Sequence, residues 1–456
     1  MKQNNNTWMK TRKFLNDIHL WIGLASGLIV FVVCLSGTIY VFNNEIREAA
    51  TPELYNVKPT ADGQKLAAAK LIANVEAASG GKVISVKIPA AADRSWQLGV
   101  KKSGPPEGKG AGQKEGKNGK DKKGMNAGTK GPGKGGGRPT MYYVDPYNGA
   151  VLGNSADIKS GTITFMTYMF SLHRWLILDK VEKPIFGELE NRKLGSYITG
   201  TATILFTLGV LTGMVIWFPR KIRAWKQGFN IKWSGNWKRI NHDLHNSLGM
   251  YSCIFLFLMG ITGPQWSFEW YRTGLRKALG VHTAENGPKP EGKGSEKGRA
   301  ETGSAETVAP AGDGQRPTVE DYQAAAAKVF NYKGDVVIAV PADPIEPVNV
   351  SKFKAGFFAP AAADKLTLDQ YASKVLKVDR FSDLPFNERV SGSIKALHLG
   401  DVYGMFTKII YFFACLIATS LPVTGTLIWL NKMKKKKPEN RLTAKQENSL
   451  ATVVTS

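Results

Sequence analysis

Four of the six histidines occupy two pairs of matching positions in the chain. His19 and His245 lie near the start of apolar stretches, and His173 and His398 each follow a leucine beside another apolar stretch. Neutral imidazole is a common metal ligand. Because no Cys, Asp or Glu cluster stands nearby at metal-ligand spacing, the pattern does not indicate tetrahedral zinc. Two imidazoles on opposite helices suit the two axial positions of a haem iron.

Small residues follow two of these histidines at helical spacing. Residues i, i+4 and i+8 share one face of a helix. A porphyrin is flat, so the helix that carries its ligand needs small residues on that face. Ordinary close packing of helices through small residues is the alternative explanation. The two rows are His19, Gly23 and Gly27 in one stretch, and His245, Gly249 and Cys253 in the other.

The surroundings of the histidines recur along the chain, as in an internal duplication. Residues 16–19 (NDIH) match residues 242–245 (HDLH), and residues 145–147 match residues 369–371. All four long apolar stretches end in Ser or Thr followed by Gly: Ser36-Gly37, Thr212-Gly213, Thr262-Gly263 and Thr424-Gly425. His242 aligns with Asn16 and is therefore rejected as a ligand. His282 has no counterpart and is interpreted as a solvated side chain.

The repeat predicts two parallel halves related by a pseudo-twofold axis along the membrane normal. His19 would then face His245 near one surface, and His173 would face His398 near the other. A single histidine could be only a polar residue at the membrane boundary, but four in register favour ligation. Iron with two histidine ligands has no open position, which favours electron transfer. We therefore expect one haem near each surface and electron flow across the membrane.

The apolar residues are gathered in four stretches that approach or exceed the ~20 residues needed to span hydrocarbon. Hydrophobic residues are 43% and charged residues 21% of the 456 residues, so the overall composition does not reveal these stretches. Their presence nevertheless excludes a water-soluble enzyme. Only three cysteines are present, which excludes a disulfide scaffold; Cys34, Cys253 and Cys415 lie in apolar stretches and are read as packing residues. The predicted spans are residues 18–42, 197–218, 247–268 and 405–430.

Short segments rich in basic residues lie on one side of the spans. They lie within residues 2–13, within residues 219–241, where no acidic residue occurs, and after residue 431. Short basic segments remain cytoplasmic. We therefore expect a four-pass membrane protein with both termini in the cytoplasm. The net charge is +24, and the basic residues that produce it lie beside spans or in Gly-rich linkers without interleaved aromatic residues. Nucleic acid is therefore not an expected partner.

Two other assignments of the apolar stretches compete with four spans. The first span could be a cleaved signal peptide, but its apolar run is about twice the usual length and no small-x-small site follows it. Residues 162–178 could form a fifth span, but that would place the basic 219–241 segment outside. A helix along the outer membrane surface is the better interpretation.

The extracytoplasmic segments read as two small α+β modules. Helices are expected at residues 64–79 and 319–330, and strands at 82–88, 95–100, 141–145, 335–340 and 365–369. Gly-, Lys-, Glu- and Pro-rich inserts at 101–139 and 284–316 are expected to be disordered. The expected organisation is 1–43 (N-terminus and first span), 44–160 (first module), 161–196 (surface helix with His173), 197–218 (second span), 219–245 (cytoplasmic loop), 246–268 (third span), 269–404 (second module), 405–430 (fourth span) and 431–456 (cytoplasmic tail).

The order and spacing of these motifs resemble those of the PepSY-associated transmembrane proteins. The resemblance rests on His19-x-x-x-Gly23, Asp145-Pro-Tyr-Asn-Gly149 before Val151-Leu152, Leu172-His173-Arg174-Trp175, His245-x-x-x-Gly249 and Leu397-His398-x-Gly400. It covers nearly the whole chain outside the two inserts. It implies a membrane α-helical fold with periplasmic PepSY domains, two b-type haems held by the same four histidines, and ferric-siderophore reduction. The second module departs from the pattern at Gln370, Ala372 and Ser373.

We therefore expect a haem-dependent oxidoreductase of the bacterial inner membrane. An electron from a cytoplasmic or quinol donor would enter at the His19/His245 haem, move to the His173/His398 haem, and reduce ferric iron held in a siderophore or another periplasmic acceptor. Trp175 and Trp266 would border the exit path. The alternatives are a cytochrome b-like subunit of a larger oxidoreductase and a non-enzymatic PepSY membrane regulator.

Overall fold

The computed structural model describes residues 2–101, 139–218, 225–281 and 316–435, except residues 342 and 344. The predicted disordered inserts therefore lie outside the described residues, apart from their end residues 101, 139 and 316. His282 and the last part of the basic tail lie outside them as well.

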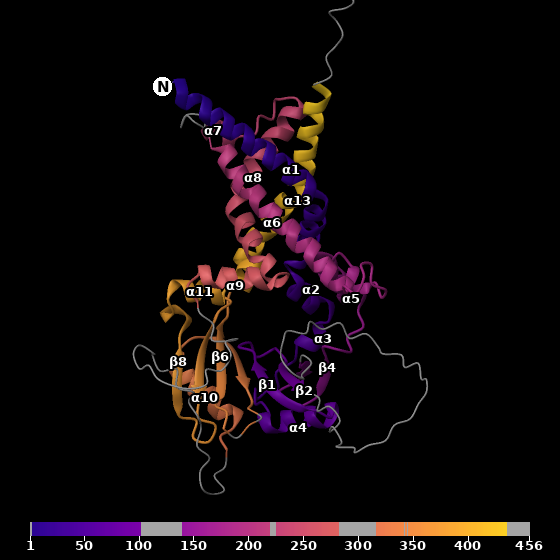
Figure 1. The fold of residues 1–456 in the computed structure, drawn as a ribbon. Helices are drawn as coiled ribbons and strands as arrows, with labels where there is room; N and C mark the ends of the chain where they lie inside the picture. Colours follow the sequence, from indigo (N-terminus) through magenta and orange to yellow (C-terminus); the bar gives the residue numbers. More distant parts are fainter. Residues whose placement is uncertain are drawn as a thin grey trace, which may run out of the picture.

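Four long helices form a bundle: α1 (Lys2–Tyr40), α6 (Asn191–Trp217), α8 (Trp237–Thr262) and α13 (Gly404–Lys435) (Figure 1). Each contains a segment that is long and apolar enough to cross a membrane. Helix α1 packs against α6 and α13, and α8 packs against the same two helices. Leu28, Ile254 and Phe413 are among the large apolar side chains exposed on the bundle surface. Such an exposed apolar surface is suited to hydrocarbon rather than water.

Small residues bring the helices together inside the bundle. Leu256 of α8 packs with Ala414 and Ala418 of α13, and all three are buried. Small side chains allow the backbones of membrane helices to approach closely. The cysteines are free; Cys253 and Cys415 are buried and Cys34 is partly buried. They therefore pack in the bundle, in agreement with the packing role predicted for them.

The bundle helices extend beyond the predicted spans. Helix α1 runs back to Lys2, and α8 begins at Trp237 rather than at residue 247. The predicted limits followed hydropathy alone, whereas a helix can continue through polar residues outside hydrocarbon. Asn236 caps α8 by accepting a hydrogen bond from the N–H of Arg239. His245 therefore lies inside α8, within the segment of residues 219–245 that was predicted as a cytoplasmic loop.

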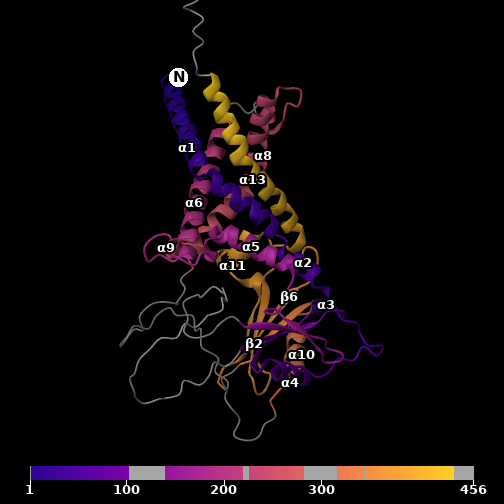
Figure 2. The ribbon, with the colours of Figure 1, turned by 90° about the vertical axis from the view of Figure 1, so that its right-hand side faces the viewer.

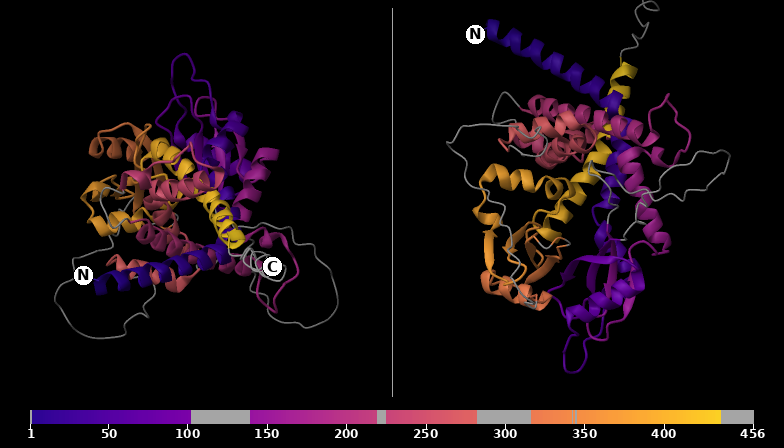
Figure 3. Two further views of the ribbon diagram at one scale, coloured as in Figure 1. Left: turned by 90° about the horizontal axis from the view of Figure 1, so that it is seen from above. Right: turned by 60° about the horizontal axis from the view of Figure 1, so that its bottom comes forward.

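A single antiparallel sheet lies at one end of the bundle (Figure 1). Its strands are β1 (Lys82–Ile88), β2 (Trp96–Lys101), β3 (Thr140–Val144), β4 (Val151–Asn154), β5 (Gly334–Ala339), β6 (Val348–Lys354), β7 (Ala363–Leu368) and β8 (Val375–Asp379). The spatial order is β4-β3-β2-β1-β5-β6-β7-β8, and β1 pairs with β5 through Val86 and Ile338. The two modules expected from the sequence are therefore joined into one eight-stranded sheet, seen side by side in Figure 3.

Two helices cover the sheet through one shared core. Leu71 and Val75 of α4 (Ala68–Ser79) are buried with Ala326 of α10 (Val319–Val329) and with the strands. Helix α4 begins four residues later than predicted, because the N–H of Leu66 donates to the carbonyl of Pro146 instead of continuing a helix. Five strands agree with the prediction to within two residues at each end; β4, β6 and β8 were not predicted.

Short helices lie between the bundle and the sheet. They are α2 (Asn43–Ala50), α3 (Pro52–Tyr55), α5 (Gly161–Trp175), α9 (Glu269–Ala278), α11 (Phe386–Gly392) and α12 (Ile394–Leu399). Figure 2 shows α5 lying across the long helices at this level rather than along them. We call this end of the bundle the sheet side. The opposite end carries the start of α1 and the short helix α7 (Trp225–Phe229), and we call it the α7 side.

Candidate paired-histidine site

His19 and His245 face each other near the α7 side of the bundle. His19 belongs to α1 and His245 to α8, and their ring centroids are 6.3 Å apart with an angle of 80° between the ring planes. Both side chains are half-buried. The structure therefore brings together the two residues that the repeat predicted to form one pair.

His173 and His398 form a second pair at the sheet side. His173 lies in the last turn of α5 and His398 in the last turn of α12. Their ring centroids are 6.2 Å apart, with an angle of 58° between the planes. Two short surface helices, rather than two bundle helices, thus present these imidazoles to each other.

Each histidine of the first pair is held by a neighbouring bundle helix. The Nδ1 atom of His19 lies 3.0 Å from the carbonyl oxygen of Gly209 and 3.1 Å from Oγ1 of Thr212, both in α6. The Nδ1 atom of His245 lies 2.8 Å from Oγ1 of Thr424 in α13, and the backbone of Leu421 is its second partner.

The second pair is held in the same manner. The Nδ1 atom of His173 lies 2.8 Å from the carbonyl oxygen of Val33 in α1. The Nδ1 atom of His398 lies 3.0 Å from Oγ1 of Thr262 in α8, and the backbone of Met259 is its second partner. At three of the four sites, a threonine hydroxyl meets Nδ1. At all four sites, the histidine has a backbone partner three residues before the Ser or Thr of a Ser/Thr-Gly string.

The glycine of each Ser/Thr-Gly string lies against the imidazole. A Cβ atom built on the glycine would stand between 3.1 and 3.4 Å from Cε1 of the histidine at all four sites. Such a contact is tighter than nearly all real Cβ contacts, so a larger residue would displace the ring. The pairs are Gly213 with His19, Gly37 with His173, Gly425 with His245 and Gly263 with His398.

These contacts explain the four related strings noted in the sequence, whose role sequence analysis missed. Each string provides a glycine that lies against the imidazole, and a backbone partner of Nδ1 lies three residues before its Ser or Thr. At the three threonine strings the hydroxyl contacts Nδ1 as well. We call this arrangement the Ser/Thr-Gly socket. The repeated Ser/Thr-Gly pairs were visible, but which histidine each would hold depends on contacts between segments far apart in the chain.

The sockets determine which ring nitrogen carries the proton. The hydroxyl groups of Thr212, Thr262 and Thr424 donate to carbonyls of their own helices. Their oxygens, like the carbonyl oxygens, can therefore only accept a hydrogen bond from Nδ1–H. The proton is thus on Nδ1 and the lone pair is on Nε2. No hydrogen bond from a described residue reaches Nε2 at these four histidines.

Burial keeps the sheet-side imidazoles neutral. Burial lowers the pKa of His173, and the neighbouring charge of Arg174 acts in the same direction. Burial, and then the ring of His173, lower the pKa of His398 to about 3. Both side chains are therefore uncharged at neutral pH, the state in which imidazole binds a metal.

The separation within each pair fits one metal ion held between two imidazoles. A bond of about 2 Å from metal to ring nitrogen on each side, with about 1 Å from that nitrogen to the ring centre, gives about 6 Å between centroids. The observed separations are 6.3 and 6.2 Å. Within the described residues, no group of three or more His, Cys, Asp or Glu side chains is suited to hold a metal ion.

The predicted glycine rows divide between two roles. Gly23 is exposed, and a Cβ atom built on it would contact nothing within 4 Å. This leaves the helix face beside His19 free for a flat group. Gly27 and Gly249 lie instead against Pro422 and Leu421 of α13, at 3.5 and 3.7 Å from the built Cβ atoms. These two positions therefore serve helix packing, the alternative considered for the glycine rows.

The two pairs stand near opposite ends of the bundle. His19 and Gly37, which contacts His173, are both in α1, and eighteen residues separate them. At about 1.5 Å per helical residue this is about 27 Å. His245 and Gly263 have the same spacing along α8 and its end. The separation approaches the ~30 Å thickness of the hydrocarbon core.

Aromatic and basic side chains surround the sheet-side pair. The indole of Trp266 stands 4.9 Å from the His398 ring between centroids and is 41% exposed. Trp175 is buried. Arg174 donates a hydrogen bond of 3.2 Å to the carbonyl of Trp266. Of the two tryptophans that were predicted to border an exit path, Trp266 is therefore the one at the surface beside an imidazole.

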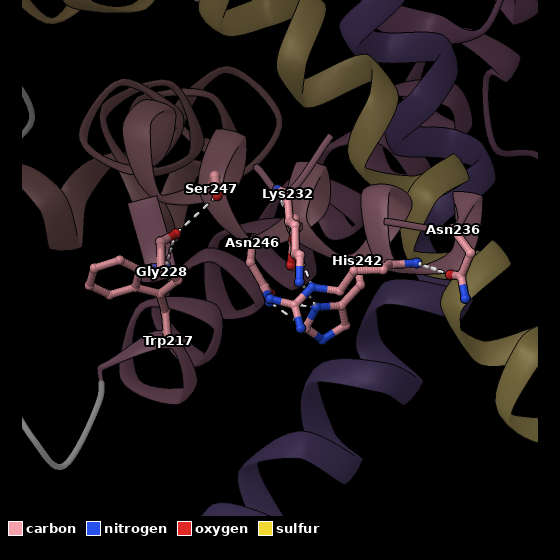
Figure 4. Close-up of polar contacts among 9 residues, drawn as sticks. Trp217, Gly228, Lys232, Asn236, His242, Asn246 and Ser247 are labelled. Atoms are coloured by element: carbon pink, nitrogen blue, oxygen red, sulfur yellow. Dashed lines mark hydrogen bonds and ion pairs between the residues drawn. The ribbon is translucent and has the colours of Figure 1, made fainter. Parts of the chain in front are cut away.

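His242 lies apart from both pairs. Its side chain is exposed and contacts Nδ2 of Asn246 at 3.2 Å, as Figure 4 shows. The same view shows Gly228 of α7, whose carbonyl accepts hydrogen bonds from Ser247 and Trp217. At the beginning of α8, His242 is thus hydrogen-bonded to Asn246 rather than paired with another imidazole of the described residues.

The fold and the paired histidines define a membrane protein with four apolar helices, a sheet at one end and two imidazole pairs across the bundle. Its sequence matches the model of the PepSY-associated TM region over residues 17–432, so the chain belongs to that family. A search of curated proteins found no match.

Proposed function

We propose that this protein is a dihaem b-type oxidoreductase of a bacterial inner membrane. It would take electrons from a cytoplasmic or quinol donor and reduce ferric iron, held in a siderophore or another chelate, in the periplasm. Both termini and α7 would lie in the cytoplasm, and the sheet would lie in the periplasm. The observation that carries the proposal is the pair of 6.3 and 6.2 Å separations between facing imidazoles.

The protein's own residues would bind and orient each haem. His19 and His245 would supply the axial ligands at the α7 side, and His173 and His398 would supply them at the sheet side. The Ser/Thr-Gly sockets hold the proton on Nδ1, so that Nε2 would be the ligating atom. When bound, a haem with two imidazole ligands supplies reversible one-electron transfer, since no coordination position remains for oxygen.

The proposed topology follows from the charge of the short segments. The first residues of α1, the segment that contains α7 and the end of α13 are basic. Short basic segments remain in the cytoplasm. The sheet lies at the other end of the bundle, beside the His173–His398 pair. This orientation places that pair where a periplasmic acceptor can approach it.

We also infer that the two halves arose by duplication and that each contributes a PepSY domain to the sheet. The strand order is symmetric about the β1–β5 junction. In both halves an aspartate starts the turn before the last strand: Oδ1 of Asp145 accepts from the N–H of Tyr147, and Oδ1 of Asp369 accepts from the N–H of Tyr371. The second turn places Ser373 at φ 52°, where the first has Gly149 at φ 76°.

The purified protein from haem-replete cells tests the proposal. We expect a Soret band, a sharp reduced α band and two haems per chain. The reduced protein should be reoxidised rapidly by a ferric siderophore without an added subunit. A colourless protein would contradict the proposal and favour a membrane regulator. A dihaem protein that ferric chelates fail to reoxidise would favour the subunit of a larger oxidoreductase.

The Thr424 socket makes a more specific prediction. Thr424→Val removes the hydroxyl that accepts from Nδ1–H of His245, so the imidazole donates less electron density to the metal. We expect the midpoint potential of one haem to rise by about 40 mV, if the hydrogen bond contributes about 1 kcal/mol. Redox titration followed by optical spectroscopy measures the shift.

Thr426→Val is the matched control. Thr426 lies in the same helix, and its hydroxyl donates to the carbonyl of Pro422 without contacting a histidine. The haem midpoint potentials of the Thr426→Val variant should equal those of the unmodified protein. Equal potentials in the Thr424 variant would show that the socket does not tune the cofactor.

A further inference from the structure

Two arginines meet beside the His173–His398 pair. Arg174 follows His173 in α5, and Arg192 lies in the first turn of α6. The guanidinium carbon of Arg192 stands 4.2 Å from the ring centroid of Trp175, and that of Arg174 stands 6.0 Å from the same ring. The indole of Trp175 is buried, so both cations gather around one rigid side chain.

Backbone contacts fix this junction. The hydroxyl of Thr199 in α6 donates to the carbonyl of Arg174 at 3.0 Å. Gly195 of α6 lies directly against the backbone of Trp175, with no room for a Cβ atom. The end of α5 is therefore held against the start of α6, and the two arginines cannot separate without breaking these contacts.

The described residues offer these two cations no carboxylate. Neither arginine has an Asp or Glu oxygen within 4.0 Å in the described part of the chain. Between α5 and α6, Asp179 is paired with Lys180 and Glu190 with Lys193. Arg174 has one backbone acceptor, the carbonyl of Trp266. The Nη2 atom of Arg192 is buried and has no hydrogen-bond partner among the described residues.

Such an arrangement is unfavourable unless an anion is present. Two like charges repel, and Arg174 and Arg192 are close enough for each charge to act on the other. A buried guanidinium that lacks an acceptor also loses the hydrogen bonds that water would give it. The fork of N–H donors in arginine matches a carboxylate, which accepts two parallel hydrogen bonds. One carboxylate between the two side chains would neutralise charge and occupy the free donors.

We propose that Arg174 and Arg192 together form a carboxylate-binding site at the sheet-side end of the bundle, beside the His173–His398 pair. Two sources of the carboxylate are compatible with this position. One is a propionate of a haem held by that pair, a source that rests on the proposed function. The other is a carboxylate of an iron chelate that approaches from the sheet side. Both sources would place negative charge next to the imidazoles.

The first experiment measures binding of an external carboxylate. Radiolabelled citrate is equilibrated by dialysis with the full-length protein prepared with and without haem, in about 0.15 M salt to screen the general positive charge. Arg174→Gln and Arg192→Gln are compared with Lys193→Gln, a control that changes an exposed cation one residue away in α6. For an external source, saturable binding should weaken at least tenfold in both arginine variants and remain unchanged in the control.

The second experiment tests a propionate of the cofactor. The full chain from haem-deficient cells is loaded with haem or with its dimethyl ester, which lacks free carboxylates, and the bound amount is counted. For a propionate source, the unmodified protein should retain more haem than dimethyl ester. Arg174→Gln and Arg192→Gln should remove that difference, and Lys193→Gln should preserve it.

The two experiments separate this proposal from the proposed function. If the protein holds no haem, citrate binding still decides whether the arginines form a carboxylate site. The proposal would be overturned if citrate did not bind and the protein also failed to distinguish the two cofactors. The second condition is met if the protein retains haem and its dimethyl ester equally, or retains neither. Displacement of citrate by an equal concentration of inorganic phosphate would overturn the assignment to a carboxylate.

Discussion

Replacing His245 by alanine should remove one haem from the protein and leave the other in place. The variant deletes the imidazole that faces His19 across 6.3 Å, and the His173–His398 pair stands about 27 Å away along the bundle. The two sites share no imidazole, so we expect the haem content per chain to fall by half. His19→Ala should give the same result. The pyridine haemochrome assay measures the content.

His242→Ala is the matched control for this prediction. His242 lies three residues before His245 in α8 but is exposed and hydrogen-bonded to Asn246. Its removal should leave both haems. Loss of haem from the His242 variant, with full retention in the His245 variant, would mean that the facing pair is not the ligand pair.

Replacing His398 by alanine should separate the two halves of the proposed reaction. The haem at the sheet side would be lost, whereas the His19–His245 pair and its sockets would remain. We therefore expect the remaining haem to be reduced normally, and its reoxidation by a ferric siderophore to slow by more than about 100-fold, since this exceeds the usual effect of altering a residue that only supports a ligand. Stopped-flow spectroscopy follows both half-reactions. His173→Ala should behave in the same way.

Tyr168→Ala is the control for the sheet-side variants. Tyr168 belongs to α5, as His173 does, but is 46% exposed. This variant should keep both haems and reoxidise at the normal rate. If His398→Ala keeps two haems and a normal rate of reoxidation, the sheet-side pair has no role in electron transfer. If both the His398 and the Tyr168 variants lose haem, disruption of the surface helices rather than loss of a ligand would explain the result.

The sequence by itself was sufficient for features that depend on local composition and on the repeat. The four apolar stretches could be located because each meets the length that hydrocarbon requires. The pairing of His19 with His245 and of His173 with His398 followed from matching positions in two parallel halves. Strands such as β1 were predicted because the alternation of apolar and polar residues is a local property.

The tertiary structure decided the features that arise between distant segments. The pairing of β1 with β5 joins two expected modules into one sheet, and no local pattern specifies which edges will meet. The Ser/Thr-Gly strings were visible in the sequence, but their role as sockets depends on contacts such as that between Thr424 and His245. The meeting of Arg174 with Arg192 likewise depends on how the end of α5 packs on α6. Local sequence determines which elements form, whereas the packing of those elements decides which side chains meet.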